Sequence, residues 1–197
     1  MLVTADETQA SLTGAWRLML GKAEGVRLLN LTADGFWNSF YAIAIAVPAL
    51  VVGWVGIANE IGEPDAFAQR LAILVRLAMV DLGAWVLPLI GLAVIAPRAG
   101  IGDRFVAYVV ASNWASAIIA WLMLPAALVR MLLPDGAGIA GFVSLFCFIL
   151  SIVLTWRMTN TVIGKGVAVG AAVFLGMFVA SVAVLFALQA LLGITVP

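Results

Sequence analysis

Apolar residues run in long stretches along most of this chain, and polar residues gather in short segments between them. Five stretches are about 20 residues long or longer, the length that a helix needs to cross about 30 Å of hydrocarbon. None shows the strict alternation of a membrane β-barrel, so we expect an all-α polytopic membrane helix bundle. The five predicted spans cover about residues 36–57, 77–96, 105–129, 138–156 and 166–192.

The first 35 residues have a different pattern and are expected to form a cytoplasmic segment. Residues 1–10 are polar, and we expect them to be loose. Residues 11–36 place apolar side chains on a stripe with helical spacing and basic side chains off it, which predicts an amphipathic helix lying in the membrane interface. The stripe consists of Leu12, Trp16, Leu20, Val26 and Leu29, and the basic residues are Arg17, Lys22 and Arg27.

The remainder, residues 36–197, is expected to be one transmembrane domain, with Trp37 and Tyr41 at one interface and Trp54 at the other, as in aromatic belts. The loops at residues 58–70, 97–104, 130–137 and 157–165 are too short for a soluble catalytic domain. Seven basic residues fall on the N-terminal side and three on the opposite side, which predicts a cytoplasmic N-terminus and, after five crossings, a C-terminus on the far side of the membrane. The seven are Arg17, Lys22, Arg27, Arg98, Arg104, Arg157 and Lys165, and the three are Arg70, Arg76 and Arg130.

Composition supports the membrane assignment and narrows the chemistry. Hydrophobic residues make up 65% of the chain and charged residues 10%, against about 25% charged in soluble domains. The net charge is zero, so nothing indicates a nucleic-acid partner, and the chain has no histidine, the commonest metal ligand and general base. We therefore expect no metal and no cofactor, and we expect Cys147 to be a small buried hydrophobe.

Asp81 is the most unusual residue, because it lies about one turn inside the predicted second span, where a charge is costly. Arg76, at the head of that span, can extend its side chain to water. Asp81 should face the bundle interior, where it either accepts hydrogen bonds from Ser144 and Ser181, which are expected at similar depth, or stays protonated. Three interpretations stay open: a polar clamp between helices, a proton or cation site, and a water-facing residue at a tilted helix end.

A second polar cluster, "ASNWAS" at residues 111–116, places Asn113 inside the third span with Ser112 and Ser116. An asparagine in a membrane helix commonly bridges to another helix, and the alternative is that it lines a pore or substrate pathway. Pro48, Pro88 and Pro125 lie within three of the spans, where proline can kink a helix. Kinked or broken helices recur at transporter sites.

The fifth span carries a ridge of small residues that predicts close helix packing, within the protein or between protomers. Gly166 and Gly170 form a GxxxG motif, and Gly176 continues the ridge together with Ala172 and Ala180.

The layout of a short N-terminal region, five closely spaced spans and a short tail resembles the Yip1-like membrane proteins. The stretch "LTADGFWNSFYAIAIAVPALV", residues 31–51, is similar to the start of the first span in bacterial proteins of this type. The resemblance would cover the chain from about residue 30 to its end. It implies adaptors in membrane trafficking in eukaryotes and integral membrane proteins in bacteria, some of them loosely labelled transporters, and it transfers no catalytic residues. We accordingly expect a multi-pass protein of a bacterial inner membrane with a periplasmic C-terminus.

Three classes of function follow. The first is a non-enzymatic scaffold or accessory subunit, whose partners are the lipid bilayer and other membrane proteins or further copies of the chain. The second is a small transporter or permease that uses a polar site around Asp81, with Asn113, Ser144 and Ser181. The third, an intramembrane enzyme, is disfavoured because no nucleophile–base pair or metal cluster is visible.

Overall fold

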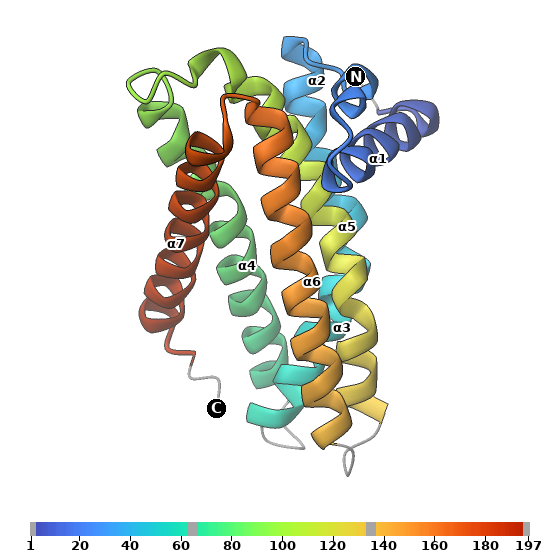
Figure 1. Ribbon diagram of the computed structural model, residues 1–197. Coiled ribbons are helices and arrows are strands. Elements are labelled where there is room, and N and C mark those ends of the chain that lie inside the picture. The colour runs from blue at the N-terminus through green and yellow to red at the C-terminus, as the bar shows by residue number, and fades with distance from the viewer. Residues whose placement is uncertain (1–2, 63–66, 133–136, 195–197) are drawn as a thin grey trace.

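The computed structural model describes residues 3–62, 67–132 and 137–194, and this part of the chain consists of helices joined by short turns (Figure 1). Five long helices run alternately up and down, so α1 and the end of α7 lie at opposite ends of the bundle. The helices are α1 (Ala5–Met19), η1 (Ala23–Leu28), α2 (Ala33–Asn38), η2 (Ser39–Tyr41), α3 (Ala42–Ile61), α4 (Phe67–Ile95), η3 (Gly102–Arg104), α5 (Phe105–Leu132), α6 (Ala137–Ile163) and α7 (Val167–Leu192).

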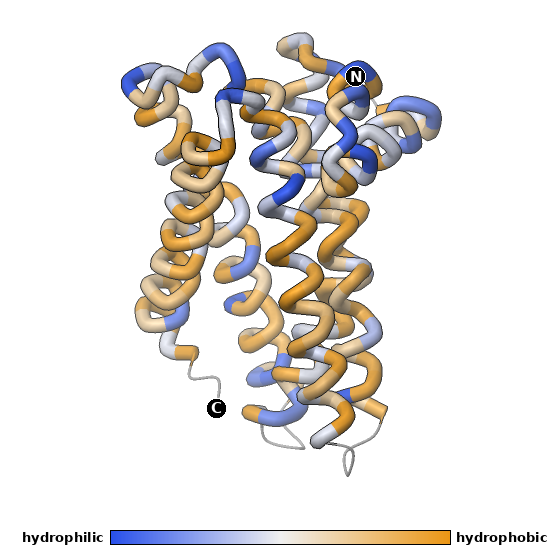
Figure 2. The backbone as a smooth tube through the Cα atoms, in the orientation of Figure 1, coloured by the Kyte–Doolittle hydropathy of each residue, from blue (hydrophilic) through white to orange (hydrophobic). Residues whose placement is uncertain are grey.

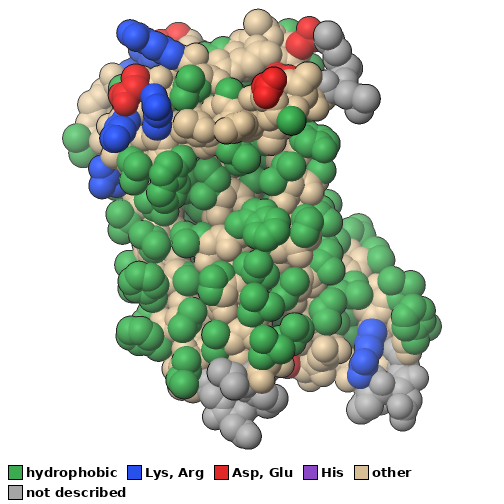
Figure 3. All heavy atoms as spheres, turned by 90° about the vertical axis from the view of Figure 1, so that its right-hand side faces the viewer, with side chains coloured by type: hydrophobic (Ala, Val, Ile, Leu, Met, Phe, Trp, Pro, Cys, Tyr) green, Lys and Arg blue, Asp and Glu red, His purple; other side chains and the backbone are tan. Residues whose placement is uncertain are grey.

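Five helical segments are long and apolar enough to cross a membrane, which confirms the predicted all-α bundle and makes this a multi-pass membrane protein. Hydrophobic positions fill the middle of the bundle, and hydrophilic positions gather mainly at its two ends (Figure 2). Figure 3 shows the same division on one face, where charged side chains cluster at the end that carries α1 and apolar side chains cover the middle. The segments are Ala33–Ile61, Phe67–Ile95, Gly102–Leu132, Gly138–Ile163 and Val167–Leu192.

Two of the predicted spans are too short. Helix α4 begins at Phe67 rather than near residue 77, and α6 continues to Ile163 rather than ending near residue 156. Arg70 and Arg76 lower the local hydropathy, but arginine is a good helix former and its long side chain can reach water. Asp81 consequently lies 14 residues beyond the first residue of α4, or about 21 Å along the helix axis.

The N-terminal segment also differs from the prediction. Residues 11–36 form three short helices instead of one, and residues 1–10 are not all loose, because α1 begins at Ala5. Thr4 caps α1 by accepting a hydrogen bond from the backbone N–H of Glu7 at 3.2 Å. This Thr-x-x-Glu spacing is a recognised helix-start pattern that was present in the sequence.

Helix α1 is packed against the bundle, contacting α5 and α6, rather than lying free in the interface. Its buried face contains Ala15, Leu18 and Met19, all fully buried, whereas Trp16 of the predicted stripe is 44% exposed. Gly14 allows η1 to approach closely, since a Cβ there would lie 2.8 Å from the carbonyl oxygen of Gly25. The apolar face of α1 is therefore used largely for tertiary packing.

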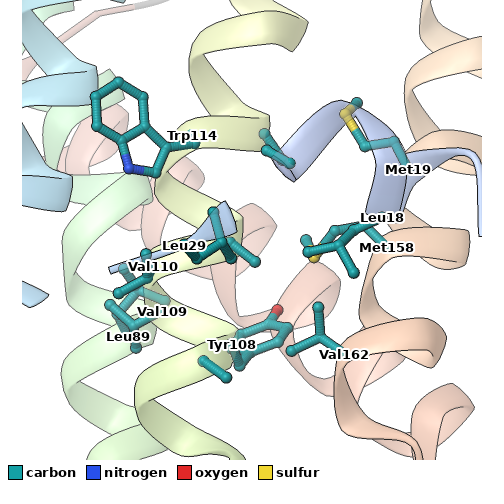
Figure 4. Close-up of a cluster of buried hydrophobic side chains, with 14 of the residues drawn as sticks. Leu18, Met19, Leu29, Leu89, Tyr108, Val109, Val110, Trp114, Met158 and Val162 are labelled. Atoms are coloured by element: carbon teal, nitrogen blue, oxygen red, sulfur yellow. The ribbon is translucent and has the colours of Figure 1, made fainter. Parts of the chain in front are cut away.

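The main core lies around α5, which packs against α3, α6 and α1. Tyr108 and Trp114 of α5 are buried there, and Tyr108 points toward Met158 and Val162 of α6 (Figure 4). Helix α7 contributes only Val173 to the buried members of this cluster and packs instead against α4 and α6. Helices α3, α4 and α5 each continue through their internal prolines, Pro48, Pro88 and Pro125.

Candidate functional site

Asp81 is held by a tryptophan from the neighbouring helix. The indole Nε1–H of Trp54, on α3, donates a hydrogen bond of 2.6 Å to Oδ2 of Asp81, on α4. Trp54 is 8% exposed and belongs to a small buried cluster with Ala58 and Leu77, so its side chain faces the interior of the protein. Trp37 and Tyr41, at 71% and 46% exposed, have the exposure expected of belt residues.

The predicted hydroxyl partners of Asp81 were wrong. Within the part of the chain that the structure describes, no hydrogen bond joins Asp81 to Ser144 or Ser181. The prediction relied on a start for the second span ten residues too late, which placed Asp81 at the wrong depth relative to the other helices.

Asn113 forms a second clamp, this time between three segments. The indole Nε1–H of Trp85, on α4, donates to Oδ1 of Asn113 at 2.9 Å, and Nδ2 of Asn113 donates to Oγ of Ser39 at 2.9 Å. The Ser39 hydroxyl in turn donates to the carbonyl oxygen of Phe36 at 2.6 Å. Asn113 and Ser39 are fully buried, so this chain of hydrogen bonds is shielded from lipid and water.

Sequence reasoning missed both tryptophan partners, although a usable pattern was present. An indole N–H inside an apolar span needs an acceptor, because leaving it unpaired in a low-dielectric medium is costly. Asp81 and Asn113 are the strongest side-chain acceptors within the predicted second and third spans. Pairing them with Trp54 and Trp85 was therefore a reasonable inference that the aromatic-belt interpretation obscured.

A pocket of about 410 Å³ lies between the α4–α7 pair and the α5–α6 pair. Ser181 of α7 and both serines of the "ASNWAS" cluster, Ser112 and Ser116, line it, but Asp81 and Asn113 do not. Two serines donate to carbonyl groups of their own helices: Ser112 to Val109 at 3.0 Å and Ser151 to Cys147 at 2.8 Å. The pocket therefore brings together hydroxyl groups in a mainly apolar lining.

The other predicted residues are dispersed. Ser144 of α6 is partly exposed and lies outside this pocket, and the structure shows no hydrogen bond from it to a described residue. Cys147 is buried at 5% exposure, as expected of a small hydrophobe. The predicted four-residue polar site is therefore split into two clamps, one pocket residue and one separate serine.

The glycine ridge of α7 is also divided. Gly170 is buried, and a Cβ there would collide with the side chain of Asn160 and lie 3.0 Å from its Cα atom, so Gly170 is a true packing glycine between α6 and α7. Gly166 is exposed at the start of α7 with φ +95°, and it serves the turn rather than helix packing. Gly176 has open space around its Cα atom and lines an apolar groove of about 700 Å³ between α4 and α7.

Polar contacts at the two ends of the bundle fix the loops. Lys165 donates to Oδ1 of Asp103 and to the carbonyl oxygen of Gly100, both at 2.6 Å, and so joins two loops at the end that carries α1. At the other end, Arg130 and Glu60 form an ion pair of 2.7 Å between α5 and α3. Across residues 3–62, 67–132 and 137–194 there is no group of three or more side chains suited to hold a metal ion.

Comparisons with protein-family models, with curated proteins and with solved structures found no significant match. The resemblance to Yip1-like proteins therefore stays a prediction, and the function has to be inferred from the geometry of this chain.

Proposed function

We propose that this multi-pass membrane protein is a non-enzymatic scaffold or accessory subunit of the Yip1-like type in a bacterial inner membrane. The main support for this proposal is that the polar side chains within the spans hold helices together. Asp81 and Asn113 are each hydrogen-bonded by a tryptophan of another helix, and neither lines the pocket of about 410 Å³. Polar side chains that are held in hydrogen bonds between helices stabilise the bundle, and they are not free to bind a solute along a pathway.

The orientation that we propose has the N-terminus in the cytoplasm and the C-terminus in the periplasm. All seven basic residues assigned to the cytoplasmic side belong to the end that carries α1, the 96–104 turn and the 157–165 region, while Arg70, Arg76 and Arg130 belong to the other half of the bundle. The positive-inside rule favours this orientation. Accessibility of single cysteines placed at Gly100 and at Gly62 to a membrane-impermeant reagent would test it, and labelling of Gly100→Cys from the periplasm would reverse it.

A scaffold needs a face that contacts partners, and α7 is the strongest candidate. Only 6% of its most apolar 18-residue window is buried inside the protein, compared with 17–22% for the other four spans. Val179 and Leu175 are more than half exposed on this helix. Helix α7 is therefore available to another membrane protein or to a second copy of this chain.

Site-specific photo-crosslinking in intact membranes tests the scaffold. A photoreactive amino acid at Val179 or Leu175 of α7 should give a discrete adduct with one partner protein. The reciprocal experiment, with the reactive group on that partner, should recover this chain. Phe142 and Phe146, 72% and 61% exposed on α6, are matched control positions that should give less adduct. Equal adducts from both helices, or none, would contradict a partner site on α7.

The alternative, a small transporter that uses Asp81, makes a different prediction. In that case, vesicles containing the purified protein would show a proton or cation flux that Asp81→Asn abolishes. Under the scaffold proposal, vesicles with either protein show no protein-dependent flux. The variant should also stay folded, because an amide oxygen can still accept the hydrogen bond from Trp54.

A further inference from the structure

The 410 Å³ pocket between the α4–α7 pair and the α5–α6 pair is not explained by a scaffold role. It has a closed end and a mouth. Tyr108, Ala115 and Met158, at the closed end, are 1–3% exposed, whereas Phe148 and Phe178 are 47% and 38% exposed and bring the pocket to the molecular surface. Both phenylalanines lie within membrane-spanning helices, so the mouth faces the bilayer.

The residues that line the pocket indicate what charge a bound molecule can carry. Among its residues there is no aspartate, glutamate, lysine or arginine. A charged headgroup would be without a counter-charge in a medium of low dielectric constant, which is strongly unfavourable. The pocket therefore suits an uncharged molecule.

The serine and threonine hydroxyl groups of the pocket indicate which polar group the bound molecule should carry. Ser112, Ser116, Ser151, Thr155 and Ser181 come from three different helices and all line the same space. Ser112 and Ser151 donate their protons to carbonyl groups of their own helices but keep lone pairs that can accept. An occupant with a hydroxyl group can donate its one proton to either of these oxygens and can accept from a third hydroxyl.

The rest of the lining suits a hydrocarbon chain. Met123, Met177 and Phe174 line the pocket beside the two phenylalanines at the mouth. Methionine adapts its shape to flexible apolar ligands. The volume falls within the range of about 300–1,000 Å³ that is typical of ligand pockets, and the chain of a larger lipid can continue through the mouth into the bilayer.

We propose that this pocket binds a neutral lipid with a hydroxyl-bearing head, of the diacylglycerol or long-chain alcohol class. The head lies among Ser112, Ser116 and Ser151, and the hydrocarbon chain leaves past Phe148 and Phe178. This site goes beyond the scaffold role and does not depend on it, because it makes no use of the exposed face of α7.

Photoaffinity labelling of the full-length protein in lipid nanodiscs tests the proposal. A diazirine-bearing diacylglycerol should label pocket residues, with unlabelled diacylglycerol and a long-chain alcohol as separate competitors that distinguish the two lipid sources. A phosphatidylcholine probe with the same diazirine chain should not label the closed end. The proposal would be overturned if the phosphatidylcholine probe labelled Tyr108 and Met158 as strongly as the diacylglycerol probe does. It would also be overturned if neither competitor reduced the labelling.

Two kinds of variant make the test specific. Ser181→Phe fills the pocket and should abolish competition-sensitive labelling, while Ser144→Phe places the same ring on α6 outside the pocket and should leave labelling intact. Should Ser181→Phe fail to fold, Ser116→Ala and Ser151→Ala remove single hydroxyl groups at little steric cost. Each should weaken competition by diacylglycerol about fivefold, the effect of one hydrogen bond. Unchanged competition in both of these variants would refute the hydroxyl-recognition part of the proposal.

Discussion

Helices α5 and α7 are both apolar enough to span a membrane, yet they differ widely in how much of each is buried in the protein. Helix α7 is the more apolar of the two, but among the described residues two of α7 are buried, against ten of α5. The more hydrophobic helix is thus the less buried one. In a bilayer, lipid tails solvate apolar side chains as well as other helices do, so hydropathy indicates immersion in lipid and not contact with protein.

Helix α5 is distinguished by several side chains whose polar atoms need a partner within the protein. Asn113 cannot be left in hydrocarbon without a hydrogen bond, and Tyr108 and Trp114 carry polar atoms on large rings. Helix α7 has Gly170 as its close contact with α6, and Leu188 of α7 packs over Gly83 of α4. Polar and small residues, rather than apolar content, therefore decide which helices pack against each other.

The largest effect that we expect comes from Asn113→Leu. The variant leaves the Trp85 indole and the Ser39 hydroxyl without their present partner in the centre of the bundle, and it should lower the free energy of unfolding by about 2–3 kcal/mol. Unfolding in mixed detergent micelles measures the change. Ser112→Ala on the same helix removes a hydroxyl that bonds only to its own helix and should cost far less. Equal losses would mean that the clamp is not what anchors α5.

Gly170→Ala tests the contact that attaches α7. The new methyl group would meet the side chain and Cα atom of Asn160, and overpacking of this kind costs about 1–3 kcal/mol. Crosslinking between single cysteines on α6 and α7 should fall together with stability. Gly176→Ala is the matched control, because nothing lies within 4 Å of the place that its new Cβ would take, and alanine should raise helix propensity slightly. Similar behaviour of the two variants would show that α7 is held elsewhere.

Trp54→Phe tests the clamp on Asp81 and should cost about 1 kcal/mol, because the hydrogen bond of 2.6 Å is lost while most of the ring packing stays. Asp81→Asn should cost less, since its amide oxygen still accepts. When Trp54→Phe is combined with Asp81→Leu, which removes the acceptor, the two effects should be strongly non-additive. Simple additivity of the two free-energy changes would indicate that the two residues do not interact energetically.

The smallest effect should come from Glu60→Gln, which breaks the ion pair with Arg130 at the end of α3 and α5. Both side chains are partly exposed, at 34% and 51%, and exposed ion pairs contribute about 0–1 kcal/mol. Added salt should reduce even this difference between the variant and the unchanged protein. A larger loss that salt does not alter would place this pair in a more shielded environment than its exposure indicates.

The candidate site could be predicted only in part. Asp81 and Asn113 were identifiable because polar residues in apolar spans are rare and costly. Their partners were not, because Trp54 and Trp85 are 27 and 28 residues away in the chain and the pairing depends on how neighbouring helices are rotated and shifted. Ser181 and Ser144 were grouped with Asp81 by depth alone, and the early start of α4 was enough to make that grouping wrong.

The membrane environment, the helical class and the five crossings could be predicted from the amino-acid sequence, since these depend on local properties of the chain. A stretch of about 20 apolar residues must satisfy its own backbone hydrogen bonds in lipid, and a helix does so without any neighbour. Tertiary structure alone decided that α1 packs on the bundle, that tryptophans hold Asp81 and Asn113, and that hydroxyl groups from three helices share one pocket. Those outcomes depend on how far each helix is rotated about its axis and shifted along it. Apolar content leaves these two quantities open, because every face of such a helix is equally soluble in lipid.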